Sequence, residues 1–362
     1  MKIAQVAPLF ESVPPKLYGG TERIVSYLTE ELVRMGHDVT LFASGDSVTG
    51  ATLVPCCERS LRLDPACKDQ FAHHIVELEQ VLRRAEEFDL VHFHVDYLHF
   101  PLSRRNPHRH VTTLHGRLDL PDLVPLYREF PEMPVVSISD AQRAPVAWAN
   151  WQGTVYHGIP ADLHRFRERS GDYLVFLGRL SPEKRCDRAI EIARQVGMEL
   201  RVAAKVDVAD REYFETVIRP LLKEPGVEFL GEVDEAGKDD LLGNAAALLF
   251  PIDWPEPFGL VMIESMACGT PVIAFRRGSV PEVMAEGVTG FVCDTVDEAV
   301  RAVRNLSSVS RRGCRAVFDD RFTARRMAED YLDVYRRLAQ SPRSQVPSPK
   351  SQTPQGTDGR AA

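Results

Sequence analysis

The chain has 362 residues, which suits two domains of about 150 residues each. Its hydrophobic fraction of 44% and charged fraction of 27% are ordinary for a globular protein, and no apolar run approaches the roughly 18 residues of a transmembrane helix. The net charge of −8 argues against a general nucleic-acid-binding protein, which needs a basic surface. The seven cysteines include no Cys-x-x-Cys pair, so we expect reduced thiols and a cytoplasmic location.

Strands and helices alternate along the first half of the chain. Helical spacing of apolar residues predicts helices at 22–35 and 71–88, and Gly36 follows the first of them as a helix-ending residue. Short apolar runs predict strands at 3–8, 39–43, 90–95, 111–115 and 135–139. Short strands joined by helices indicate an α/β fold with a parallel sheet that is covered on both faces.

The same alternation restarts after residue 172. It predicts strands at 173–177, 200–204, 227–230, 247–251 and 271–274, with a helix from about residue 185. The charged stretch 165–172 has the composition of a linker, so we expect two Rossmann-like domains at 1–165 and 166–321. A late amphipathic helix follows within 322–340. The last segment, 341–362, has Val346 as its only large aliphatic residue, and we expect it to be disordered.

One motif stands out near the end of the second domain. It reads Trp-Pro-Glu-Pro-Phe-Gly-Leu-Val-Met-Ile-Glu and runs from Trp254 to Glu264. A helix is predicted to begin at Gly259, and the free backbone N–H groups of such a helix start suit a phosphate. Glu256 precedes the helix and Glu264 lies inside it, so the two carboxylates can contact different parts of one extended ligand. The alternative is a proline-rich turn followed by a helix with an exposed glutamate.

This motif resembles that of the family 4 glycosyltransferases, in which two glutamates are separated by seven residues. The following Ala-Cys-Gly-Thr-Pro-Val at 267–272 matches a turn of the same family. The resemblance implies the GT-B fold, in which two Rossmann-like domains face a cleft, and helix 322–340 crossing back to the first domain. It also implies transfer, with retention, of a hexose from a UDP- or GDP-sugar. Glu256 would contact the donor sugar, Glu264 the ribose, and the helix start at Phe258, Gly259 and Leu260 the diphosphate.

Two further motifs supply groups for a diphosphate. Phe-Leu-Gly-Arg-Leu-Ser-Pro-Glu-Lys at 176–184 follows a predicted strand, and Arg179 and Lys184 then lie at the ligand-binding edge of the sheet. Tyr-Gly-Gly-Thr at 18–21 lets the backbone of Gly19 and Gly20 approach an anion before a helix. A solvated loop with two cations and a flexible glycine loop are the alternatives. The family resemblance assigns both motifs to the donor diphosphate.

Histidines mark the ends of two strands in the first domain. His115 ends the strand at 111–115, and the family places a histidine here against the donor sugar near the reacting carbon. His92 and His94 share a face with Asp96, a pattern that could bind zinc, but the family carries histidine here without a metal, and we expect none. His157 stands where the family usually has asparagine, which leaves its role open. Val-Glu-Phe-Leu-Gly-Glu at 227–232 resembles the family's base-reading strand, so Leu230 and Gly231 are assigned to the base.

The expected partners follow from this resemblance. The donor is a nucleotide sugar, and the acceptor is a carbohydrate, a lipid-linked sugar or a small molecule. Because the sequence has no Asp-x-Asp triplet, we expect no metal and no other cofactor. A basic cluster at 104–110 would meet an anionic acceptor or the inner face of a membrane, unless it is a solvated loop. A sugar-nucleotide epimerase of the same fold and a non-catalytic nucleotide-sugar-binding protein remain as alternatives.

Overall fold

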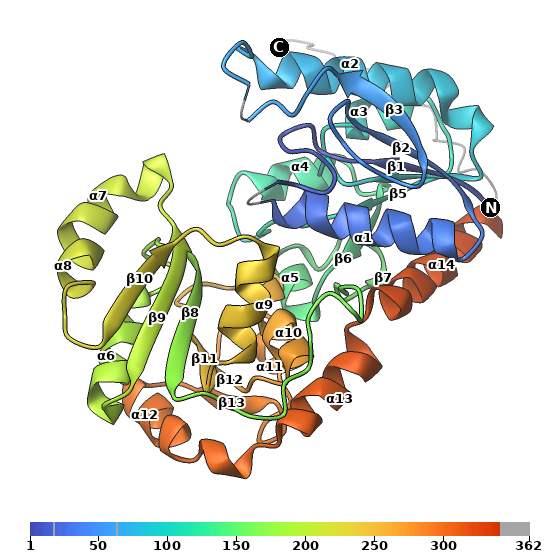
Figure 1. Ribbon diagram of the computed structural model, residues 1–362. Coiled ribbons are helices and arrows are strands. Elements are labelled where there is room, and N and C mark those ends of the chain that lie inside the picture. The colour runs from blue at the N-terminus through green and yellow to red at the C-terminus, as the bar shows by residue number, and fades with distance from the viewer. Residues whose placement is uncertain (17–18, 63, 341–362) are drawn as a thin grey trace, which may run out of the picture.

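A computed structural model describes residues 1–16, 19–62 and 64–340 of the chain. These residues form two parallel sheets with helices on both faces (Figure 1). The first sheet has the strand order β3-β2-β1-β4-β5-β6-β7. Its strands are β1 (Lys2–Val6), β2 (Asp38–Ser44), β3 (Thr52–Cys57), β4 (Leu90–Phe93), β5 (His110–Thr113), β6 (Pro134–Ser137) and β7 (Asn150–Thr154).

The helices that accompany the first sheet include α1 and α2, which the sequence predicts. They are α1 (Gly20–Arg34), α2 (Gln70–Arg84), α3 (Phe100–Arg105), α4 (Leu123–Glu129) and α5 (Asp140–Arg143). Helix α1 buries Ile24, Leu28 and Leu32, three residues at helical spacing, against this sheet. Gly36 has a φ of 85°, a left-handed conformation that glycine adopts without strain, directly after this helix.

The second sheet has the strand order β10-β9-β8-β11-β12-β13. Its strands are β8 (Tyr173–Arg179), β9 (Glu199–Lys205), β10 (Val227–Gly231), β11 (Ala247–Phe250), β12 (Val272–Phe275) and β13 (Gly290–Cys293). The α-helices around it are α6 (Cys186–Val196), α7 (Arg211–Tyr213), α8 (Arg219–Leu221), α9 (Glu235–Gly243), α10 (Leu260–Cys268), α11 (Val280–Val283), α12 (Val296–Arg304) and α13 (Arg311–Arg321). The two sheets and their covering helices confirm the predicted α/β fold of GT-B type.

The last helix, α14 (Ala324–Gln340), returns from the second sheet to the first. In Figure 1 it lies beside α1, although the two are far apart in the sequence. Met327, Tyr331 and Tyr335 are buried with residues of α1 and of the first sheet. The two chain segments that pass between the sheets also pair, because Ile159 N–H donates to Phe322 O at 3.0 Å and Ala324 N–H donates to Ile159 O at 2.8 Å.

Three strands of the structure are absent from the sequence prediction. They are β3, β7 and β13, and each lies at an edge of its sheet. Strand β3 contains Pro55 and is partly exposed, β7 is largely polar, and β13 begins with Gly290. The apolar periodicity that predicts a buried strand is therefore weak in all three.

The structure places Gly178 differently from the sequence prediction. The predicted strand ends at residue 177, but Gly178 lies inside β8, where it pairs with Ala204. The strand therefore carries Arg179 to its own end. The segment 341–362, predicted to be disordered, lies outside the described residues.

Candidate active site

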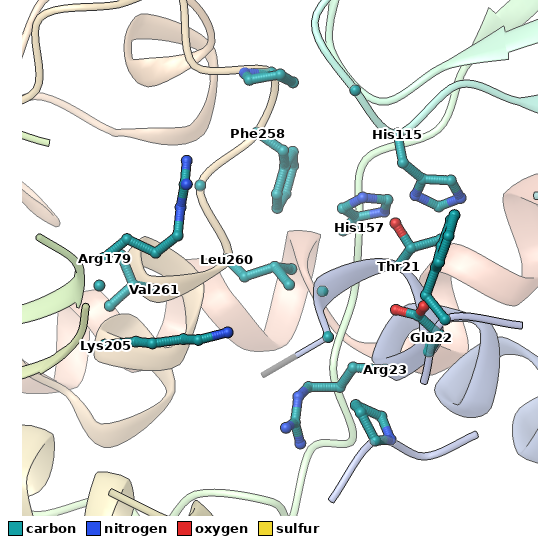
Figure 2. A pocket seen from close by; sticks show the side chains of 18 of the residues that line it. Thr21, Glu22, Arg23, His115, His157, Arg179, Lys205, Phe258, Leu260 and Val261 are labelled. Atoms are coloured by element: carbon teal, nitrogen blue, oxygen red, sulfur yellow. The ribbon is translucent and has the colours of Figure 1, made fainter. Parts of the chain in front are cut away.

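A cleft of about 740 Å³ opens between the two sheets, at the ends of their strands. Ten of the predicted site residues line it: Gly19, Gly20, His115, Arg179, Lys184, Glu256, Phe258, Gly259, Leu260 and Glu264. Figure 2 shows His115 and His157 from the first half of the chain facing Phe258, Leu260 and Arg179 from the second. Leu230 and Gly231, predicted to bind the base, are not among the lining residues. The residues that follow them, 232–235, do line the cleft.

Two helix starts face each other across this cleft. Gly259 precedes α10 with a φ of 81°, a left-handed conformation that glycine adopts without strain. A Cβ added at Gly20, in the first turn of α1, would lie 4.0 Å from Leu260. The N-termini of α1 and α10 are therefore close together, and both direct positive helix dipoles and free N–H groups toward an anion in the cleft.

Glu256 and Lys184 form an ion pair, which the sequence does not predict. The indole N–H of Trp254 donates to the same carboxylate at 3.0 Å, and Lys184 lies over the Trp254 ring, 4.9 Å from its centroid. Backbone contacts fix the position of Glu256 further, because Ser279 N–H donates to its carbonyl oxygen at 2.9 Å. A cation and a carboxylate are thus held together directly before α10.

Glu264 is also paired with a lysine. Lys238 of α9 lies 2.8 Å from Glu264 Oε1 and 2.7 Å from Glu235 Oε1. Burial would raise the pKa of the Glu264 carboxyl, but Lys238 and His164 outweigh it and hold this pKa below its usual value. Glu235 in turn pairs with Arg23 of α1, so this cluster joins the two sides of the cleft. Lys238 and Arg23 are site residues that sequence reasoning missed.

Arg179 enters the cleft among acidic side chains. Its guanidinium lies 3.3 Å from Asp207 and 3.6 Å from Asp210. Lys205, on the neighbouring strand, lies 3.0 Å from Asp207. Arg179 and Lys205 therefore share the Asp207 carboxylate. The charge of this pair is therefore partly neutralised before any ligand binds.

His115 is held by a chain of buried hydrogen bonds that begins on α14. Tyr335 Oη lies 3.1 Å from Gln5 Nε2 and 2.7 Å from His92 Nδ1. Gln5 Oε1 lies 2.8 Å from His94 Nε2, and His94 Nδ1 lies 2.9 Å from His115 Nε2. Since a neutral imidazole has one donor and one acceptor, each ring in this chain fixes the tautomer of the next.

Burial keeps these histidines neutral. It lowers the pKa of His115 to about 3, and it lowers the pKa of His94 and His157 well below the usual value. His157 stacks on His115 with ring centroids 5.3 Å apart and meets the edge of Phe258 at 4.9 Å. His157 therefore connects the predicted catalytic histidine to the segment that precedes α10.

The described residues contain two groups that could hold a metal ion, and both include His164. One combines it with Asp239 and Cys268, and the other with Glu235 and Glu264. Asp239 already binds Arg165 and Arg167 at 3.1 Å, and Lys238 bridges Glu235 and Glu264. Protein cations thus occupy the positions beside these carboxylates. His92, considered above as a zinc ligand, instead bonds Thr113 and Tyr335, each at 2.7 Å.

The basic cluster at 104–110 lies outside the cleft lining. Arg104 is paired with Glu129 at 2.7 Å and Glu132 at 2.6 Å, and His108 and the ring nitrogens of His110 are turned into the protein. Among the described residues, we find no helix long and apolar enough to cross a membrane.

The two halves of the chain match two family models. Residues 18–151 match Glycosyltransferase Family 4, and residues 164–312 match Glycosyl transferases group 1. Among curated proteins, the chain is 29% identical over 174 residues to N-acetyl-alpha-D-glucosaminyl L-malate synthase of Bacillus anthracis. It is 31% identical over 200 residues to D-inositol 3-phosphate glycosyltransferase of Saccharomonospora viridis. These matches cover 45% and 49% of this chain and 44% of each relative, so less than half of either relative is matched.

Solved structures match over nearly the whole chain. AviGT4, a glycosyltransferase involved in avilamycin A biosynthesis, has a TM-score of 0.69 at 25% identity, and the match covers 94% of this chain and 98% of AviGT4. Anabaena HepE, solved with UDP and glucose, has a TM-score of 0.70 at 19% identity, with 93% of this chain and all of HepE covered. The family models, the relatives and the fold agree, and the chain belongs to the family 4 glycosyltransferases.

Proposed function

We propose that this protein transfers a hexosyl group from a nucleoside-diphosphate sugar to an acceptor hydroxyl, with retention at the anomeric carbon. The single observation that carries the proposal is the pair of facing helix starts at Gly20 and Gly259, with Lys184 and Glu256 beside them. A diphosphate leaving group needs positive charge and N–H donors as its bond to the sugar breaks. Each hydrogen-bond donor that is held in place before the reaction raises the rate by about 10²- to 10³-fold.

The remaining site residues take the other parts of the donor. Glu264 accepts hydrogen bonds from the ribose diol, and His115 contacts the sugar near the reacting carbon. Leu230 and Gly231 stay assigned to the base, and the adjacent residues 232–235 line the cleft. UDP and GDP are the first nucleotides to test, since HepE, a protein of this fold, was solved with UDP and glucose.

The test is a thermal-stability screen with UDP-, GDP- and ADP-sugars, followed by product analysis. A bound donor sugar raises the melting temperature by mass action. A glycosylated product that keeps the α configuration of the donor would then support transfer with retention. Sugar interconversion without any acceptor would identify an epimerase. Tight donor binding with neither hydrolysis nor transfer would identify a non-catalytic binding protein.

We also propose that the reaction needs no metal, because Lys184 and the helix starts supply the positive charge beside the diphosphate. Turnover should persist in excess EDTA. Loss of turnover that Mg²⁺ or Mn²⁺ restores would contradict this. We propose a cytoplasmic location, and co-sedimentation with anionic vesicles would reveal a peripheral membrane contact through the cluster at 104–110.

A further inference from the structure

Asp96 lies in the cleft but has no part in the donor site described above. It follows β4, and its side chain is open to the cleft on the side of the first sheet. Strands β4 and β5 are neighbours, so their ends bring Asp96 next to His115. The backbone N–H of His115 favours the charged form of the Asp96 carboxyl and opposes the rise in its pKa, in agreement with this proximity.

The backbone of Asp96 adopts a conformation that few residues accept. Its φ is 51°, in the left-handed region, although it is not glycine. Residues in such conformations are strained and cluster at functional sites. The turn holds the carboxyl group at the edge of the cleft. A role in packing does not explain this, because the side chain is exposed to the cleft.

The charge around Asp96 differs from that around the donor carboxylates. Glu256 and Glu264 each carry a lysine, whereas Asp96 forms no ion pair among the described residues. Because the cleft walls hydrate a charge less well than bulk water does, they raise the pKa of Asp96 to about 6, against the opposing effect of the His115 N–H. A carboxylate without a cation repels anionic groups and accepts hydrogen bonds from neutral hydroxyl groups.

The first half of the chain also contributes aromatic rings to the cleft lining. Phe71 of α2 lines the cleft and is 64% exposed, and Phe10 lines it after β1. An exposed aromatic ring and a carboxylate that line the same cleft suit the two surfaces of a sugar ring, which has apolar C–H faces and polar edges. The groups around Asp96 therefore suit a neutral hydroxyl compound, whereas the helix starts at Gly20 and Gly259 suit an anion.

We propose that Asp96 binds a hydroxyl group of a sugar or polyol acceptor, next to His115, and that Phe71 covers an apolar face of the same acceptor. This proposal rests on the proposed function and names the class of its second substrate. Asp96 would orient the attacking hydroxyl toward the anomeric carbon of the donor. It makes no contact with the nucleotide.

The decisive variant is Asp96→Asn, because asparagine has the same shape and also tolerates the left-handed region. Asp122→Asn is the matched control, since Asp122 is exposed on the same half of the chain, makes no capping hydrogen bond and lies outside the cleft lining. Phe71→Ala is a second variant whose folding is not at risk, because the ring is exposed. Each protein is assayed with the donor that stabilises it most, using water, glucose, mannose, galactose, glycerol and myo-inositol as acceptor probes.

We expect Asp96→Asn to lower transfer to a sugar or polyol by about tenfold or more, while the affinity for UDP or GDP stays within about twofold of the wild type. Phe71→Ala should raise the acceptor KM with little change in donor KM. Wild-type transfer rates in Asp96→Asn would overturn the proposal. So would a wild type that hydrolyses the donor but glycosylates none of these probes. A wild type that neither hydrolyses nor transfers would instead overturn the proposed function.

Discussion

The substitution Glu264→Gln should weaken nucleotide binding without stopping sugar transfer. Glu264 is buried, and Lys238 occupies its Oε1 at 2.8 Å. Glutamine keeps the shape but loses one charge-assisted hydrogen bond to the ribose diol, worth about 1.5–3 kcal/mol. That corresponds to a roughly 10- to 150-fold increase in Kd for UDP or GDP. Lys238 keeps Glu235 as a partner, so we expect the fold to survive.

Glu256→Gln should have the opposite signature. The donor sugar is where the transition state forms, and an interaction that strengthens there changes kcat rather than ground-state binding. We expect kcat to fall by about 10²–10³. The affinity for bare nucleotide should not weaken, because the change releases Lys184 from its ion pair and leaves it free for the diphosphate.

Calorimetric titration of UDP and GDP into both variants decides between these roles. Glu215→Gln, on the exposed surface of the second half of the chain, is the control and should match the wild type. If Glu256→Gln weakens bare nucleotide binding more than Glu264→Gln does, the assignment of the two carboxylates is wrong. If neither variant changes binding or turnover, both glutamates lie outside the donor site.

Three further predictions follow from buried and paired groups. Lys184→Ala should weaken donor binding by roughly tenfold or more, because it removes a phosphate contact and leaves Glu256 without its cation. Unchanged donor kinetics in this variant would contradict the prediction. Burial raises the pKa of Glu77 well above 4.5, so the folded state holds a proton that the unfolded state loses as the pH rises above about 4.5. The free energy of unfolding of the wild type should therefore fall relative to that of Glu77→Gln, by about 1.4 kcal/mol per pH unit up to the folded-state pKa. A pH-independent difference between the two proteins in denaturant titrations would refute this. Tyr335→Phe removes the hydroxyl that contacts Gln5 and His92, and it should lower both the melting temperature and kcat. Tyr213→Phe, a change outside the cleft lining, should leave kcat unchanged. Full activity in Tyr335→Phe would show that the buried hydrogen-bond chain does not act on His115.

Local sequence patterns account for most of the fold. The buried strands β1, β8 and β11 consist of apolar runs, and the helix after Gly259 follows from a glycine that has to adopt a positive φ. Positions at strand ends and helix starts are determined locally, so the sequence could bring Arg179, Lys184 and His115 to one cleft. The edge strands β3, β7 and β13 lack this signal because one side of each remains open.

Side-chain pairing could not be read from the sequence, because it depends on contacts across large sequence separations. Lys238 reaches Glu264 from a different helix, and Arg23 reaches Glu235 from the other side of the cleft. No sequence motif surrounds Lys238 or Arg23 that would mark either residue as a partner of these carboxylates. The pairs nevertheless change the chemistry, since Lys238 already occupies one carboxylate oxygen of Glu264 before any ligand binds.

The position of Asp96 could not be predicted from the sequence either. The alternation of His92, His94 and Asp96 along one segment suggested a shared face and a metal site. The structure separates the three instead, since His92 and His94 enter the buried hydrogen-bond chain while a left-handed turn takes Asp96 into the cleft. Strand periodicity ends where the strand ends, and β4 ends at Phe93. A residue beyond that point is placed by the turn, so its role has to be argued from the cleft it faces.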